Sequence, residues 1–325
     1  MTNRLVVVLG CTGTGKSDLA VSIAENFNGE VINADSMQLY NGLDIATNKI
    51  TEKEMGNVRH HMLSFLEPSC SNFTVFRFRE EVLKIIKNLW DDNKLPILVG
   101  GTSYYVESVI YENYLIPTDK GYSNKQLDNL SDDELYEYLK KIDSAFVHKN
   151  NRFRVKRAIE IYEATGVTKS DHLAKQLLKS NSSLGGTLRF PFTLVFFLDA
   201  EKEILNKRLE ARVDTMVKRG LREEIEKFYD KYSSVLPTHG INQSIALKEF
   251  QEYLRLNEEE RRSLRGQKLF EEGCELLKVH TRQYCRKQRS WYGFFTIACI
   301  YNIRSVSWDA HLKGRKHRKL LKRKE

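Results

Sequence analysis

Short, continuous apolar runs recur along the chain and are separated by stretches with helical spacing. The runs cover residues 5–9, 30–34, 95–99 and 192–198, and residues 19–27 place apolar side chains three or four positions apart. Unbroken runs this short are typical of strands buried on both faces of a parallel sheet, and amphipathic stretches between them are typical of covering helices. The pattern predicts an α/β fold with a doubly wound parallel sheet.

The alternation of strand and helix breaks after Tyr105 and resumes at residue 192. Between these points the pattern becomes helical and charged, bracketed by polar segments that are typical of loops. We therefore expect a helical insertion in the sheet domain. The expected parts are residues 1–112 (core, first part), 113–190 (helical insertion), 191–292 (core, second part, with C-terminal helices) and 293–325 (basic tail).

The turn after the first run carries a complete phosphate-binding signature. Residues 10–17 read Gly-Cys-Thr-Gly-Thr-Gly-Lys-Ser and match G-x-x-x-x-G-K-[ST] in the strand–loop–helix context that the motif requires. In such a loop the backbone amides bind phosphate oxygens, Lys16 supplies a cation and Ser17 a hydroxyl for Mg²⁺. The full match disfavours a Gly-rich turn without a ligand. The predicted phosphate-binding residues are Gly10, Thr12, Gly13, Thr14, Gly15, Lys16 and Ser17.

Polar residues also follow the later runs. Asp35 comes directly after the second run, Gly100, Gly101 and Thr102 after the third, and Asp199 after the fourth. Because the carboxyl ends of parallel strands converge on the ligand crevice of a doubly wound sheet, we expect Asp35 near the bound phosphates. Two simpler interpretations stay open: Asp35 as a helix N-cap, and Gly100-Gly101 as a tight turn.

Composition narrows the class of protein. The length of 325 residues favours two domains. The formal net charge of +9 favours a polyanionic partner. Its 5 cysteines are scattered, as is typical of reduced thiols inside cells. No apolar run approaches the ~18 residues of a membrane-spanning helix. We expect a cytoplasmic monomer without a membrane anchor, and a mitochondrial or nuclear pool stays open.

Several motifs beyond the phosphate-binding loop resemble those of the tRNA dimethylallyltransferases, also called tRNA isopentenyltransferases. The resemblance extends over residues 4–292, with the motifs in order and at plausible spacing. The motifs are Asp35-Ser36-x-Gln38-x-Tyr40, residues 42–49, His60-His61, Gly100-Gly101-Thr102-x-x-Tyr105, Arg208-x-x-x-Arg212-Val213-Asp214-x-Met216, Gly220-Leu221-x-x-Glu224, Gln243-Ser244-Ile245, Lys248-Glu249, Thr281-Arg282-x-Tyr284, Gln288 and Trp291.

The resemblance implies a P-loop NTPase-like fold and a prenyl transfer reaction. Such enzymes move the dimethylallyl group of dimethylallyl diphosphate to the exocyclic amine of the adenosine just 3′ of the tRNA anticodon. Asp35 is then expected to act as the general base for that amine. Lys16, Arg212 and Mg²⁺ on Ser17 are expected to stabilise the leaving diphosphate. Thr102 is expected to hydrogen-bond the diphosphate or to assist Asp35.

Basic residues at helical spacing predict where RNA would bind. Residues 152–157 place arginines on adjacent helical stripes, and residues 278–291 repeat the spacing with aromatic residues between the cations. In the resembled family the helical insertion grips the tRNA stem, whereas a solvated basic face is the simpler alternative. The expected tRNA contacts are Asp35, Ser36, Met37, Gln38, Arg154, Arg157, Gln243, Arg282 and Arg286.

The tail departs from the resembled family. Residues 308–317 look like the second half of the zinc finger that eukaryotic relatives carry, but Thr296 stands where a cysteine should pair with Cys299. Cys299, His311 and His317 remain as candidate ligands, and three ligands rarely close a structural zinc site. Zinc binding is therefore left open, and Mg²⁺ is the expected metal.

Two rival functions remain open from the sequence. An adenylate dimethylallyltransferase would share the phosphate loop and Asp35 but would use a free nucleotide as the acceptor; the helical insertion and residues 281–291 favour tRNA instead. A P-loop kinase or an RNA-binding ATPase would need a further metal-binding carboxylate, for which Asp199 is the candidate.

Overall fold

The computed structural model describes residues 3–112, 114–116, 124–145, 151–179, 187–292 and 300–304. It divides into two compact units. Unit 1 comprises Met1–Ile110 and Phe190–Glu325, and unit 2 comprises Tyr111–Arg189. Each unit has its own buried apolar core.

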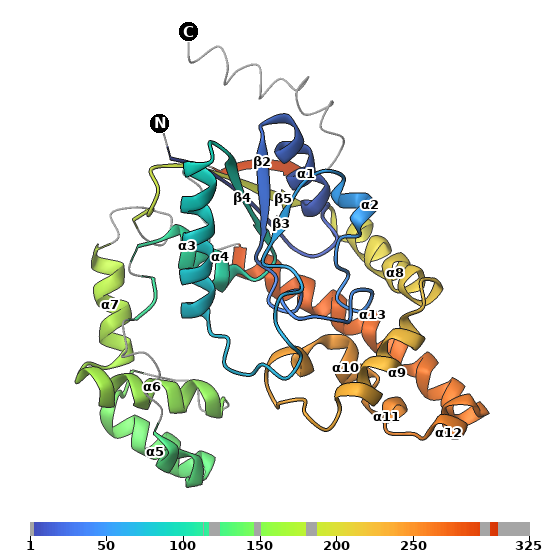
Figure 1. The fold of residues 1–325 in the computed structure, drawn as a ribbon. Helices are drawn as coiled ribbons and strands as arrows, with labels where there is room; N and C mark the ends of the chain where they lie inside the picture. The colour runs from blue at the N-terminus through green and yellow to red at the C-terminus, as the bar shows by residue number, and fades with distance from the viewer. Residues whose placement is uncertain are drawn as a thin grey trace. The chain divides into compact units, whose positions relative to one another are not determined.

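Unit 1 is built on a parallel sheet with the strand order β3-β2-β4-β1-β5-β6 (Figure 1). The four apolar runs of the sequence form four of these strands, as predicted. The strands in chain order are β1 (Arg4–Gly10), β2 (Gly29–Asn33), β3 (His60–His61), β4 (Leu95–Gly100), β5 (Phe192–Asp199) and β6 (Ile300–Arg304). Strand β1 is buried from Leu5 to Gly10, which explains why its sequence shows no polar alternation.

The strand order places a topological switch at β1. From β1 the chain moves outward to β2 on one side, and it reaches β5 on the other side only after unit 2. Parallel pairing brings the carboxyl ends of β1, β2 and β4 to one edge of the sheet. Gly10, Asn33 and Gly100 end these strands, so the residues that follow them face one crevice.

Helices of unit 1 pack around the sheet and extend beyond it. The longest, α13 (Leu264–Tyr292), contacts α8, α10 and α12 and also reaches β1 and α4 (Figure 1, orange). Helix α8 carries an apolar stripe at helical spacing, and its residues Leu205, Leu209, Val213 and Met216 are buried. The other helices are α1 (Lys16–Asn26), α2 (Glu52–Met55), α3 (Val75–Asp91), α4 (Ser103–Ile110), α8 (Lys202–Lys218), α9 (Leu221–Tyr232), η2 (Gly240–Gln243), α10 (Ile245–Glu249), α11 (Gln251–Leu254) and α12 (Glu258–Arg262).

Unit 2 is helical in the part of it that the structure describes. Its helices are η1 (Lys125–Asn129), α5 (Asp132–Ile142), α6 (Arg152–Thr165) and α7 (Lys169–Lys179). Leu135 and Leu139 of α5 pack against Val155 and Ile159 of α6 in the core of the unit. Helix α6 ends at Gly166, which adopts a left-handed conformation with φ of 68°.

No helix in the described part of the chain is both long enough and apolar enough to cross a membrane.

Candidate active site

The loop between β1 and α1 has the geometry of a phosphate cradle. Gly13 has a φ of 90°, and a Cβ atom there would lie 2.9 Å from Leu205 Cδ1, so only glycine fits. The Thr14 hydroxyl and the Lys16 ammonium both donate to the Cys11 carbonyl at 2.8 Å, which closes the loop on itself. Helix α1 begins at Lys16, so its unpaired amides face the loop.

Two cations of this site lie in protein-lined surroundings. Burial lowers the pKa of Lys16 to about 8, and the positive charge of Arg212 acts in the same direction. Burial also lowers the pKa of Arg212, whose Nη1 donates to Thr12 Oγ1 at 2.6 Å. Burial disfavours the charged form of both side chains, and a bound anion would offset this cost. The pair of cations beside one loop therefore favours binding of an anion. The sequence predicted both residues for phosphate binding, and the structure brings them to the same loop.

The lowered pKa of Lys16 predicts a pH dependence for anion binding. Bound pyrophosphate raises the pKa of Lys16, so binding above pH 8 requires uptake of a proton. We therefore expect the affinity for pyrophosphate to be nearly constant on the acid side of pH 8, apart from the titration of pyrophosphate itself. Above pH 8 it should fall by up to about tenfold per pH unit. Calorimetric titration in buffers of different ionisation enthalpy measures the proton uptake directly. Net proton uptake at pH 9 that is the same in the wild-type protein and in Lys16→Ala would contradict this role of Lys16, because the ionisation of pyrophosphate itself is common to both.

Asp35 lies at the end of β2 and sits in a tight turn rather than at a helix N-terminus. Its Oδ1 accepts a hydrogen bond from the Met37 amide at 3.0 Å, and its own amide donates to Asn33 Oδ1 at 3.2 Å. Burial raises the pKa of the Asp35 carboxyl, while the Met37 amide and the charge of Lys16 oppose the shift. A raised pKa brings a carboxylate closer to the value that a general base needs near neutral pH.

Thr102 supports this turn through its hydroxyl group. Thr102 Oγ1 accepts from the Ser36 amide at 3.1 Å and lies 3.4 Å from Ser36 Oγ. Thr102 lines neither of the two cavities of the crevice. Of the two roles that the sequence left open for Thr102, the geometry favours assistance to Asp35.

Two cavities meet at the crevice of unit 1. The smaller, of about 300 Å³, surrounds the phosphate loop, and the larger, of about 480 Å³, extends towards α10 and α13. Four residues line both: Thr12, Asp35, Asn48 and Arg212. The smaller cavity also includes Gly13, Gly15, Lys16, Ser17 and Gln38, and the larger includes Ser36, Met37, Val213, Met216, Gln243, Ile245, Leu277 and Tyr284. Gly10 and Thr14 line neither cavity, and Thr14 is buried within the loop.

Gln288 was not predicted as a site residue, although it completes the phosphate loop. It lies on α13 with 5% of its surface exposed. Its Oε1 accepts from the Thr12 amide at 2.9 Å, and its Nε2 donates to the Gly101 carbonyl at 2.9 Å. A Cβ atom at Gly101 would lie 2.4 Å from Gln288 Nε2, so Gly101 allows a close approach of α13. Gln288 thereby joins α13 to the loops after β1 and β4.

The residues predicted to contact RNA have different surroundings. In unit 1, Gln243 lines the larger cavity, Arg286 is exposed, and Arg282 forms an ion pair with Glu210 at 2.7 Å. In unit 2, Arg154 is exposed, while Arg157 is partly buried with Nη1 3.4 Å from Glu160 Oε2. In Arg282 and Arg157, part of the guanidinium group is therefore already paired with a carboxylate.

Of the candidate metal ligands, the structure describes only some. Ser17 is exposed in the smaller cavity. The three candidate zinc ligands lie outside the described residues: Cys299, His311 and His317. Within the described ranges, no group of three or more His, Cys, Asp or Glu side chains could hold a metal ion by itself.

The fold and the loop define a P-loop protein of the doubly wound α/β class, with a second cavity adjoining the cavity at the loop. The chain belongs to the IPP transferase family, whose sequence profile matches residues 38–293.

The names of similar proteins are consistent with membership of this family. The chain is 38% identical over 308 residues to the tRNA dimethylallyltransferase of Mus musculus, covering 89% of this chain and 66% of that protein. It is 37% identical to the tRNA dimethylallyltransferase of Anoxybacillus flavithermus, covering 90% of this chain and 88% of that protein. The chain thus spans about two thirds of the length of the mouse relative and most of the bacterial one.

Solved structures of the family have the same fold. A eukaryotic dimethylallyltransferase acting on tRNA superposes with a TM-score of 0.80 at 31% identity, covering 98% of this chain and 77% of that one. The tRNA isopentenylpyrophosphate transferase of Bacillus halodurans superposes with a TM-score of 0.64 at 31% identity, covering 98% of this chain and 96% of that one.

Proposed function

We propose that the protein transfers the dimethylallyl group of dimethylallyl diphosphate to the exocyclic amine of the adenosine 3′-adjacent to the tRNA anticodon. The observation that carries this proposal is the junction of the two cavities at Thr12, Asp35, Asn48 and Arg212. A donor diphosphate fits the cationic loop of the smaller cavity, and a flipped base fits the larger one. The names of the relatives support the choice of donor and acceptor.

On the donor side, the chain supplies charge for the leaving diphosphate. During transfer the bond between the primary allylic carbon and the diphosphate oxygen breaks, and the electron pair stays on the diphosphate. Lys16, Arg212 and the amides at the start of α1 face that developing charge in a partly desolvated site. Preorganised donors in such a site stabilise the transition state more than they would in water.

On the acceptor side, Asp35 takes the proton. The adenosine amine is a poor nucleophile because its lone pair is delocalised into the ring, so loss of a proton must accompany formation of the carbon–nitrogen bond. Asp35 lines both cavities, which supports this role at the junction of donor and acceptor. The turn that Thr102 and the Met37 amide stabilise fixes its direction.

The smaller cavity has the oxygen donors that suit Mg²⁺. Ser17 and Asp18 both line it. Mg²⁺ commonly keeps several waters and binds through one or two protein oxygens together with substrate phosphates, so a full protein cage is not required. When bound, the ion would supply positive charge to the diphosphate, and Ser17 would hold it. Dialysis against a chelator should then abolish transfer, and added Mg²⁺ should restore it.

A transfer assay separates the three candidate functions. Purified protein is incubated with labelled dimethylallyl diphosphate, Mg²⁺ and either unmodified tRNA or AMP. We expect label in tRNA, released by nuclease digestion as isopentenyladenosine. Label in AMP alone would favour an adenylate dimethylallyltransferase. Hydrolysis of ATP without any label transfer would favour the kinase or ATPase, although its candidate carboxylate Asp199 is engaged with Arg289 at 2.7 Å.

We further propose that the basic face of α6 binds the tRNA backbone. Replacing Arg154 and Arg157 together by Ala should weaken tRNA binding similarly for all tRNA species, because phosphate contacts carry no sequence information. Each lost contact should also flatten the log–log salt dependence of affinity by about one unit. Filter binding between low and high salt measures the slope.

The matched control is Lys84→Ala, which removes an exposed cation from α3 in unit 1. The control should leave the slope unchanged. If slope and affinity are unchanged in the arginine variant, the basic residues of α6 form a solvated surface that does not contact tRNA. A cytoplasmic location and a monomeric state stay predictions from the sequence.

A further inference from the structure

One loop forms a wall shared by both cavities. Residues 40–49, here called the acceptor loop, line the larger cavity through Ala46 and Thr47, the smaller through Lys49, and both through Asn48. Leu43 and Asn48 each have a φ of 52°, in the left-handed region. Leu43 in particular adopts this region only at an energetic cost, so surrounding contacts must hold the loop in this shape.

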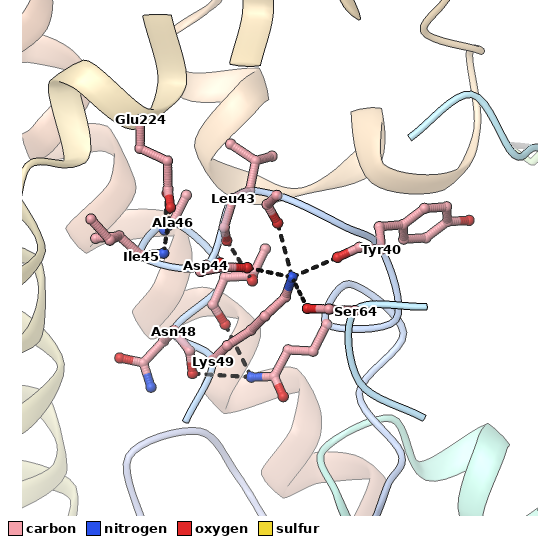
Figure 2. Close-up of polar contacts among 12 residues, drawn as sticks. Tyr40, Leu43, Asp44, Ile45, Ala46, Asn48, Lys49, Ser64 and Glu224 are labelled. Atoms are coloured by element: carbon pink, nitrogen blue, oxygen red, sulfur yellow. Dashed lines mark hydrogen bonds and ion pairs between the residues drawn. The ribbon is translucent and has the colours of Figure 1, made fainter. Parts of the chain in front are cut away.

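Lys49 holds the acceptor loop from within. Its side chain is only 3% exposed, and its ammonium donates to the carbonyls of Tyr40 and Gly42, to Asp44 Oδ1 and to Ser64 Oγ (Figure 2). A buried ammonium is tolerated when acceptors surround it, and removal of the cation would leave these acceptors unpaired. The ends of the loop are therefore tied to one point.

Glu224 holds the same loop from outside. It belongs to α9, and its two carboxylate oxygens accept the amides of Ile45 and Ala46, each at 2.8 Å (Figure 2). Burial raises the pKa of the Glu224 carboxyl, and the two amides oppose that shift. A pair of charge-assisted hydrogen bonds to adjacent amides fixes both the position and the direction of the backbone.

The acceptor loop is connected to the turn that carries Asp35. Gln38 Nε2 donates to the carbonyls of Thr47 and Asn48, both at 3.1 Å. The backbone amide of Gln38 donates to the backbone carbonyl of Asp35 at 3.2 Å. A chain of hydrogen bonds therefore runs from Glu224 through the acceptor loop and Gln38 to Asp35.

We infer that Glu224 is a positioning residue for the acceptor: it sets the wall against which the adenosine lies and, through that wall, the direction of Asp35. This inference rests on the proposed prenyl transfer. Glu224 lines neither cavity, so it acts through the acceptor loop rather than on the substrates. Loss of its contacts should misplace acceptor and base relative to the donor, a kind of error to which transfer rates are sensitive.

The test is Glu224→Gln, compared with Glu223→Gln. The first variant keeps the size of the side chain but points an amide donor at one of two backbone amides. The second removes the same charge from an exposed position of the same helix. We expect Glu224→Gln to lower the single-turnover rate at saturating donor and tRNA by about 10- to 100-fold. Pyrophosphate affinity should stay at the wild-type value, because the phosphate loop is untouched. Glu223→Gln should behave as wild type.

The outcomes separate this inference from the proposed function. Absence of transfer by the wild-type protein would overturn the proposed function. A wild-type rate in Glu224→Gln would overturn only the role of Glu224, as would a parallel loss of rate and pyrophosphate affinity. Hydrogen exchange in the wild-type protein tests the contact even if the variant does not fold. Slow exchange at the Ile45 and Ala46 amides is expected, and rapid exchange at both would overturn the inference.

Discussion

Replacing Asp35 by Asn should lower the single-turnover rate of prenyl transfer by about 10²–10⁴-fold, the range for loss of a general base. The amide keeps the size of the side chain and can still accept from the Met37 amide, so the turn should survive. Pyrophosphate binding should be no weaker, because the lost charge is negative and lies near Lys16. Rapid-quench measurement with saturating labelled donor and tRNA gives the rate, and calorimetry gives the affinity.

The control for this prediction is Asp91→Asn, which removes an exposed carboxylate at the end of α3. It should leave both rate and affinity unchanged. A near-normal single-turnover rate in Asp35→Asn would remove Asp35 from proton transfer. In that case the residue would have only its structural role in the turn after β2.

The second large effect is expected for Lys16→Ala. This change should weaken binding of pyrophosphate and of dimethylallyl diphosphate together, by about 10- to 100-fold, because a charged hydrogen-bond donor to the shared diphosphate is lost. Lys87→Ala, which removes an exposed cation from α3, should leave both affinities unchanged. Loss of affinity for one ligand only would show that the two do not share the loop. Preferential binding and hydrolysis of ATP by the wild-type protein would favour the kinase-like function.

The sequence predicts those parts of the site that depend on neighbouring residues. The phosphate loop is a continuous motif between a strand and a helix, so Lys16 and Ser17 could be placed from local pattern alone. Asp35 could be placed because the ends of parallel strands converge. The short strand β3 was not predicted, because its two histidines show neither an apolar run nor an alternation.

Contacts between distant residues explain what the sequence could not predict. Gln288 is separated from Thr12 by 276 positions, and nothing in the spacing of α13 distinguishes a buried glutamine from an exposed one. Glu224 and Lys49 belong to motifs of the resembled family, but Glu224 accepts from two backbone amides and Lys49 donates to two backbone carbonyls as well as to Asp44 and Ser64. Backbone partners leave no trace in residue identity. Arginine spacing on α13 likewise did not reveal that Arg282 would face Glu210.

The bridge made by Gln288 has a consequence for how the site comes into being. The loop at residue 12 is among the first parts of the chain to be synthesised, whereas its partner at residue 288 comes near the end of α13. Contacts of such high sequence separation form late, after the loop-closure entropy has been overcome. A partly synthesised chain therefore carries the whole phosphate motif without its finished geometry. Competence to hold a donor therefore depends on docking of the last long helix, and the donor site reports that docking.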